Sequence, residues 1–148
     1  MKFSALKSSI LEQFKTTNEV VPFIVGKPGG GKSSCAREIA QELAATHKIP
    51  AERIIEFNPS LREPCDVLGL PQFNGDCTKW LPPEEFWALR QGVGPCILIL
   101  EELSDADMNM QNPLCRVVLD RCAGQLRLSN ELFIIATGNR TEDRSGAN

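Results

Sequence analysis

The stretch Gly26 to Ser34, which reads GKPGGGKSS, constrains the fold of this chain more than any other segment. It follows the apolar run from Val20 to Val25, whose β-branched residues are typical of a buried strand. After the loop, alanine, isoleucine and leucine recur at helical spacing and predict a helix from about Lys32 to Thr46. A glycine loop between a strand and a helix lets backbone N–H groups and the positive end of the helix dipole surround an anion.

The loop also matches the pattern G-x-x-x-x-G-K-S, with Gly31, Lys32 and Ser33 at its fixed end. In that pattern the lysine reaches the β- and γ-phosphates of a nucleoside triphosphate, and the serine hydroxyl is a ligand of Mg²⁺. The residues that we expect to bind the nucleotide are Gly26, Lys27, Pro28, Gly29, Gly30, Gly31, Lys32, Ser33 and Ser34. An ordinary glycine-rich turn is the alternative, and the flanking strand and helix favour the phosphate loop.

Two acids follow a second apolar run, in the sequence ILILEEL. We expect a buried strand from Cys96 to Leu100, and ligands of open α/β sheets bind at the carboxyl ends of such strands. Glu101 is therefore a candidate ligand of Mg²⁺, and Glu102 is a candidate base that orients or deprotonates an attacking water. The alternative is a pair of surface acids at a strand end, and the complete phosphate loop favours the functional interpretation.

An asparagine follows a further apolar run, in the sequence LFIIATGNR. We expect a buried strand from Leu132 to Thr137, so that Asn139 lies at the same edge of the sheet as the phosphate loop. The side-chain amide of Asn139 can hydrogen-bond a phosphate oxygen or the nucleophilic water. The alternative is an ordinary turn asparagine before Arg140.

The rest of the chain completes an alternation of strands and helices. The other expected elements are a helix over residues 3–16, a strand at 54–57, a helix that starts after Pro82-Pro83 and ends at Gly92, and a helix capped by Asn112-Pro113 that runs to Cys122. The stretch from Ser60 to Pro83 is rich in proline, glycine, aspartate and asparagine and predicts an ordered loop region with little regular structure. The polar tail from Gly138 onward is expected to contain neither helix nor strand. This order predicts an α/β domain with a mainly parallel sheet flanked by helices.

Composition narrows the class of protein. The 148 residues suit one domain, and 42% hydrophobic with 24% charged residues are usual for a globular protein. The net charge of −3 does not indicate nucleic-acid binding. The N-terminus lacks the apolar core of a signal peptide and no run is long enough to span a membrane, so we expect a cytoplasmic protein. The six cysteines form no CxxC pair, which predicts reduced thiols rather than a zinc site.

The order of these motifs resembles that of the AAA+ ATPases. The segments PCDVLGLPQF, WLPPEEFWALRQGVGP and FIIATGNRTEDRSGAN are similar to the MoxR-type branch and its phage or bacterial relatives, over nearly the whole chain from Val20 onward. The resemblance implies a P-loop NTPase core in which Gly26 to Ser34 is Walker A and Glu101-Glu102 are the Walker B acids. It further implies that Glu102 is the catalytic glutamate, that Asn139 is sensor 1, and that Asn58 is the polar residue that holds Glu102 back.

The chain departs from the family in two ways. Glu101 stands where the family usually has aspartate, and its longer side chain moves the carboxylate outward, which bears on the tight octahedral geometry of Mg²⁺. The family also continues with a further helix, an arginine finger, a final core strand and a helical lid, whereas this sequence ends at Asn148. Arg140 and Arg144 do not stand where the family places its finger. We therefore expect a partial AAA+ core, with an N-terminal helix in residues 1–19 and the P-loop core in 20–148, without the final strand and lid.

The expected function is ATP binding and, in the intact protein, Mg²⁺-dependent ATP hydrolysis that remodels a protein partner. Relatives form rings, so self-association is expected, and the loop from Leu61 to Trp80 either faces the partner or is a packed insertion. A nucleotide-binding module without turnover and a DNA-acting AAA+ protein such as a helicase loader are the alternatives. The chain has no NKxD motif of a GTPase and no arginine-rich lid of a small kinase.

Overall fold

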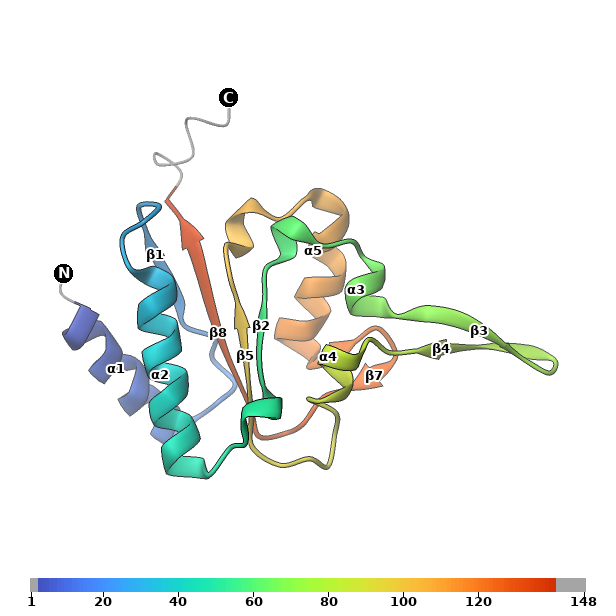
Figure 1. Cartoon of the computed structure of the whole chain (residues 1–148), viewed down its shortest axis with the longest axis horizontal. Helices are drawn as coiled ribbons and strands as arrows, with labels where there is room; N and C mark the ends of the chain where they lie inside the picture. Colours follow the sequence, from blue (N-terminus) through green and yellow to red (C-terminus); the bar gives the residue numbers. More distant parts are fainter. Residues whose placement is uncertain (1–2, 141–148) are drawn as a thin grey trace.

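The computed structural model describes residues 3–140. Its centre is a sheet of four parallel strands in the order β1-β8-β5-β2 (Figure 1). The strands are β1 (Phe23–Gly26), β2 (Ile54–Phe57), β5 (Cys96–Leu100) and β8 (Leu132–Asn139). Because all four run in one direction, their carboxyl ends lie along a single edge of the sheet, and the loops that follow them meet there.

Helices cover both faces of this sheet (Figure 1). One face carries α1 (Phe3–Thr16) and α2 (Lys32–His47). The other face carries α3 (Cys65–Leu68), α4 (Glu84–Trp87) and α5 (Met108–Cys115), and α5 continues as the π-helical turn η4 (Arg116–Asp120). Short 3₁₀ turns are η1 (Ala51–Arg53), η2 (Pro59–Leu61) and η3 (Leu103–Asp105). The structure confirms the predicted α/β architecture, a parallel sheet flanked by helices.

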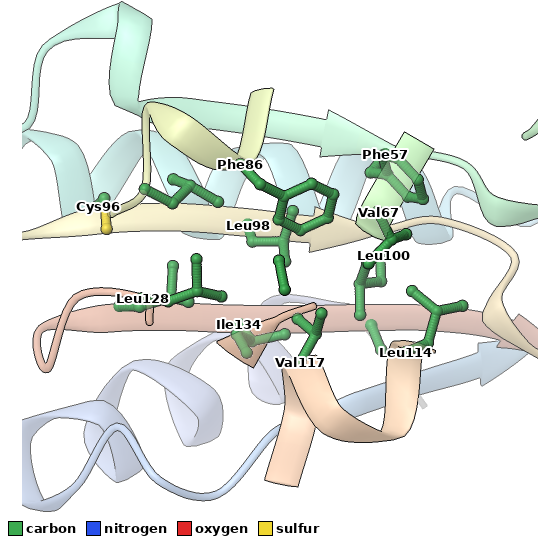
Figure 2. Packing of buried hydrophobic residues seen from close by; sticks show 14 of the residues in the cluster. Phe57, Val67, Phe86, Cys96, Leu98, Leu100, Leu114, Val117, Leu128 and Ile134 are labelled. Atoms are coloured by element: carbon green, nitrogen blue, oxygen red, sulfur yellow. The ribbon is translucent and has the colours of Figure 1, made fainter. Parts of the chain in front are cut away.

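Burial on both faces explains the unbroken apolar runs of the two central strands, β5 and β8. In β5, Ile97 and Ile99 pack with the α1 and α2 side, whereas Leu98 and Leu100 pack with the α4 and α5 side. Figure 2 shows this second cluster, in which the rings of Phe57 and Phe86 meet edge to face at 5.3 Å. The strands at 54–57 and 96–100 have the predicted bounds, and of these two only the strand at 96–100 is buried along its whole length.

The region from Ser60 to Pro83 was expected to have little regular structure, and this prediction is wrong. It contains an antiparallel hairpin of β3 (Leu70–Asn74) and β4 (Cys77–Leu81) that projects away from the sheet (Figure 1). Every residue of both strands is exposed, so no alternation of apolar and polar residues marks them. The usable signal was Gly75-Asp76, the two turn residues between the paired Asn74 and Cys77, in which Gly75 has a φ of 66°.

The predicted bounds of other elements also need correction. Asn112 is not a helix cap, because α5 begins at Met108 and Pro113 lies inside it. Met110 is buried in the core, and this tertiary contact outweighs the preference of proline for the first turn. The helix expected after Pro82-Pro83 ends at Trp87. β1 begins only at Phe23, and β8 extends to Asn139 rather than ending at Thr137.

A second small hairpin precedes β8 and was not predicted. It consists of β6 (Cys122–Ala123) and β7 (Leu126–Arg127). Residues 141–148, which include Arg144, lie outside the described part of the chain. No helix within residues 3–140 is long and apolar enough to cross a membrane.

Candidate nucleotide-binding site

The glycine loop joins the end of β1 to the start of α2. Gly29 and Gly31 have φ values of 77° and 87°, a left-handed conformation that favours glycine. The backbone N–H of Gly30 donates to the carbonyl of Lys27 at 3.0 Å and closes the turn. Gly31 is the N-cap of α2, and no side chain in residues 3–140 caps this end. The first N–H groups of α2 therefore remain available to an anion.

Lys32 lies inside this loop and is only 7% exposed. Its Nζ donates to the carbonyls of Gly26 at 3.1 Å and Lys27 at 3.2 Å, and to Oδ1 of Asn139 at 2.6 Å. These partners hold the ammonium group between the loop and the end of β8. A phosphate that binds in the loop therefore meets a positive charge that is already positioned.

Asn139 links the loop to the turn after β5. The parallel pairing of β1 with β8 places Gly26 opposite Asn139, which brings the amide to Lys32. Its Nδ2 donates to Oδ2 of Asp105 at 2.9 Å, and its backbone N–H donates to Oγ of Ser104 at 2.9 Å. The structure thus brings together Lys32 and Asn139, two residues that the sequence singled out from distant segments.

Glu102 follows β5 with a backbone that is unusual for a residue with a side chain. Its φ of 53° and ψ of 41° are left-handed, a conformation that costs roughly 1 kcal/mol or more outside glycine. Its N–H donates to Oγ1 of the fully buried Thr137 at 3.1 Å, which holds this conformation. Its carboxylate accepts from Nδ2 of Asn58 at 3.1 Å. The contact of Asn58 with Glu102 is the one implied by the AAA+ resemblance.

Glu101 lies at the end of β5, with its side chain 16% exposed. Its Oε1 is buried, accepts no hydrogen bond from residues 3–140, and lies 3.5 Å from Nη2 of Arg37. Arg37 also donates from Nε to Glu56 at 3.0 Å. The pKa of Arg37 is raised, first by that hydrogen bond and then by the charges of Glu56 and Glu101. Oε1 of Glu101 can therefore still accept a hydrogen bond or bind a cation.

This donor set fits Mg²⁺ held jointly with phosphate oxygens. No group of three or more histidine, cysteine, aspartate or glutamate residues in positions 3–140 forms a metal site by itself. Mg²⁺ in nucleotide sites uses one or two protein ligands together with phosphates and waters. The buried Oε1 of Glu101 and the hydroxyl of Ser33, in the first turn of α2, are the chain's candidates for those ligands.

Several residues at this edge were missed by the sequence analysis. They are Arg37, Ser104, Asp105 and Thr137. Ser104 and Asp105 follow the acidic pair after a single leucine, and Thr137 is a polar residue at the end of an apolar run, so weak signals were present. Lys27 and Pro28 on the loop and Ser34 in the first turn of α2 are exposed, as is Arg140 at the end of the described residues.

Comparison of the chain with solved structures tests the predicted fold. The chain is similar to NtrX from Brucella abortus, with a TM-score of 0.54 and 24% identity over 96% of this chain and 32% of NtrX. It is also similar to NtrX from Brucella abortus in complex with ATP, with a TM-score of 0.60 and 19% identity over 99% of this chain and 31% of NtrX. The chain therefore spans about a third of the length of these structures.

Identities this low establish the fold alone. The predicted fold class, an α/β domain with a mainly parallel sheet flanked by helices, is confirmed. No protein-family model matches the sequence, nor does any curated protein. These comparisons do not support the predicted MoxR-type branch.

Proposed function

We propose that this chain binds ATP with Mg²⁺ and that the intact protein hydrolyses it. The observation that carries the proposal is the 2.6 Å contact of Lys32 with Asn139, which joins the glycine loop to the turn that bears Glu102. Three segments distant in the sequence thus converge on the place where a γ-phosphate would lie. The NtrX structure in complex with ATP supports the choice of nucleotide, since it shares this fold.

Each residue has a role that its geometry permits. Lys32 binds the β- and γ-phosphates, and the N–H groups at the start of α2 bind their oxygens. Ser33 and Glu101 hold Mg²⁺, which, when bound, neutralises charge on the phosphate oxygens. Glu102 orients an attacking water or accepts its proton, and Asn139 donates from its amide to that water or to the γ-phosphate.

A nucleotide-binding module without turnover is the second candidate. It is favoured by the contacts of both acids, because Glu102 accepts from Asn58 and Glu101 lies beside Arg37. In this arrangement neither carboxylate is free of a protein partner that competes for it. Turnover then requires that Asn58 releases Glu102.

For the protein partner we propose the β3–β4 hairpin as the contact. Pro71, Phe73 and Trp80 share one face of it, and Phe73 is 83% exposed. The base of the hairpin requires glycine at position 69, because a Cβ on Gly69 would lie 2.1 Å from the carbonyl oxygen of Leu81. An ordered apolar element that projects from the core suits recognition of another protein. We also propose membership of the MoxR-type branch and ring assembly, on the resemblance alone, and we retain the cytoplasmic location that the sequence predicts.

Calorimetry and phosphate release test the proposal. Wild-type protein with ATP and Mg²⁺ should bind in the micromolar range or tighter, and Lys32→Ala should weaken binding by about tenfold or more, since a charged contact to phosphate is lost. Lys15→Ala, which changes an exposed lysine on α1, is the matched control. An affinity that Lys32→Ala leaves unchanged rules out the assignment of this loop.

A second comparison separates turnover from binding alone. Glu102→Gln keeps the size of the side chain and its contact with Asn58 but removes the base. If wild-type protein at high concentration releases no more phosphate than Glu102→Gln, the chain is a binding module. Sedimentation velocity of Glu102→Gln with ATP and Mg²⁺ tests ring assembly, and a monomer at every protein concentration contradicts it.

A further inference from the structure

We propose that Asp105 is a positioning residue that, together with Ser104, orients Asn139 so that its amide presents an N–H to the γ-phosphate. This inference rests on the proposed ATP site. Both residues belong to η3, the turn that directly follows Glu102. Ser104 accepts from the backbone N–H of Asn139, and Asp105 accepts from its side chain, each at 2.9 Å.

The close approach of η3 to β8 requires the residue before Asn139 to be glycine. A Cβ on Gly138 would lie 2.9 Å from Oγ of Ser104 and 2.5 Å from the ring of Phe23. Gly138 itself is buried, so a side chain there has no room to turn away. The glycine therefore allows Ser104 to reach the backbone of Asn139 and sets the distance between the turn and the strand.

The two partners of the Asn139 side chain determine which way its amide points. Lys32 has only donors, so it needs the oxygen of the amide, and the carboxylate of Asp105 has only acceptors, so it needs the nitrogen. A flipped amide would place an N–H against an ammonium group and an oxygen against a carboxylate. Asp105 and Lys32 thus enforce one orientation, and the second hydrogen of Nδ2 remains as a donor.

The same turn connects Asn139 to Glu102. The N–H of Glu102 donates to Thr137, two residues before Asn139 on β8, and the N–H of Asn139 donates back to Ser104. A change at Asp105 should therefore affect discrimination of the γ-phosphate and the turnover number. It should leave the affinity for ADP almost unchanged, because the contacts with the glycine loop do not involve Asp105.

The test uses Asp105→Leu, which removes the acceptor at similar size, and Asp105→Asn, which retains an acceptor oxygen. Affinities for ATPγS and ADP are measured by calorimetry with Mg²⁺. We expect the ratio of the affinities for ATPγS and ADP to be about tenfold lower in Asp105→Leu than in wild type, with the ADP affinity within about twofold of wild type. Asp105→Asn should recover part of that preference. Asp107→Leu is the control, since Asp107 is exposed, lies two residues away and caps no N–H group of α5.

Side-chain ¹⁵N NMR gives a readout that does not depend on nucleotide. The Asn139 amide signals, assigned by their loss in Asn139→Ala, should shift in Asp105→Leu and remain unchanged in Asp107→Leu. Unshifted signals in Asp105→Leu overturn the inference, and so does an equal loss of affinity for ATPγS and ADP. Wild-type protein that binds neither nucleotide overturns the proposed function, even where the NMR result supports the link between Asp105 and Asn139.

Discussion

The side-chain amide of Asn58 donates a hydrogen bond to Oε2 of Glu102 at 3.1 Å, across the carboxyl ends of the neighbouring strands β2 and β5. Oδ1 of the same amide accepts from the N–H of Ser60 at 3.0 Å and caps η2. Asn58 therefore connects the candidate base to the segment that leads toward the β3–β4 hairpin. A displacement of this segment would therefore change the contact between Asn58 and Glu102.

Replacement of Asn58 should raise basal ATP turnover. Asn58→Asp keeps the oxygen that caps η2 but removes the donor and places a negative charge beside Glu102. A hydrogen bond to a charged group contributes about 1.5 kcal/mol, so release of Glu102 should increase turnover by up to about tenfold. Steady-state phosphate release measures this. Ser60→Ala is the control, since it removes only the hydrogen bond from Oγ of Ser60 to Oδ1 of Asn58 and leaves the contact with Glu102. Slower turnover in Asn58→Asp would show that Asn58 assists Glu102.

Replacement of Arg37 should strengthen the binding of Mg²⁺. Arg37→Gln removes the positive charge 3.5 Å from Glu101 and leaves the carboxylate to the metal. Because the pair is partly exposed, we expect only about a threefold decrease in the Mg²⁺ concentration that half-saturates nucleotide binding. Arg116→Gln, which removes an exposed arginine paired with Asp120 on η4, is the control. An unchanged Mg²⁺ requirement in Arg37→Gln would mean that Arg37 has no influence on the metal site.

The hairpin should tolerate substitutions that the core does not. Phe73→Ala on the exposed hairpin should change the free energy of unfolding by less than about 0.5 kcal/mol. Phe86→Ala, at a fully buried position against Phe57, should reduce it by about 3–5 kcal/mol. Urea denaturation measures both. A large loss of stability in Phe73→Ala would show that the hairpin packs as part of the core rather than serving as a contact surface.

Stability should fall in alkaline solution because of a buried thiol. Burial raises the pKa of Cys96 from 9.0 to about 11. Below pH 9 the thiol is protonated in both states, whereas between pH 9 and 11 only the unfolded chain releases the proton. The free energy of unfolding should therefore decrease across this window by up to about 2 kcal/mol. Cys96→Ala should show a shallower decrease than Cys65→Ala, which changes an exposed thiol, and equal slopes would contradict this origin.

Strands buried on both faces were predicted with the greatest success. The run at 96–100 has the same bounds in the structure, because each of its apolar residues is buried between the two layers of helices. The strand at 54–57 also has the predicted bounds, although it lies at the edge of the sheet with Glu56 exposed, since Asn58-Pro59 marks its end. The hairpin from Leu70 to Leu81 was missed for the opposite reason. Neither face of the hairpin is buried, so hydrophobic and polar residues do not alternate along its strands. Only the turn residues indicated a hairpin.

The sequence by itself determined the phosphate loop, the acids after β5 and the asparagine at the end of β8, because each depends on a local pattern of residue types. Only the tertiary structure decided which of these residues meet. The strand order puts β8 between β1 and β5, which brings Asn139 to Lys32 on one side and to Ser104 and Asp105 on the other. Strand order follows from how the helices pack on the two faces of the sheet. That packing is a property of the whole chain, and no local window of residues contains it.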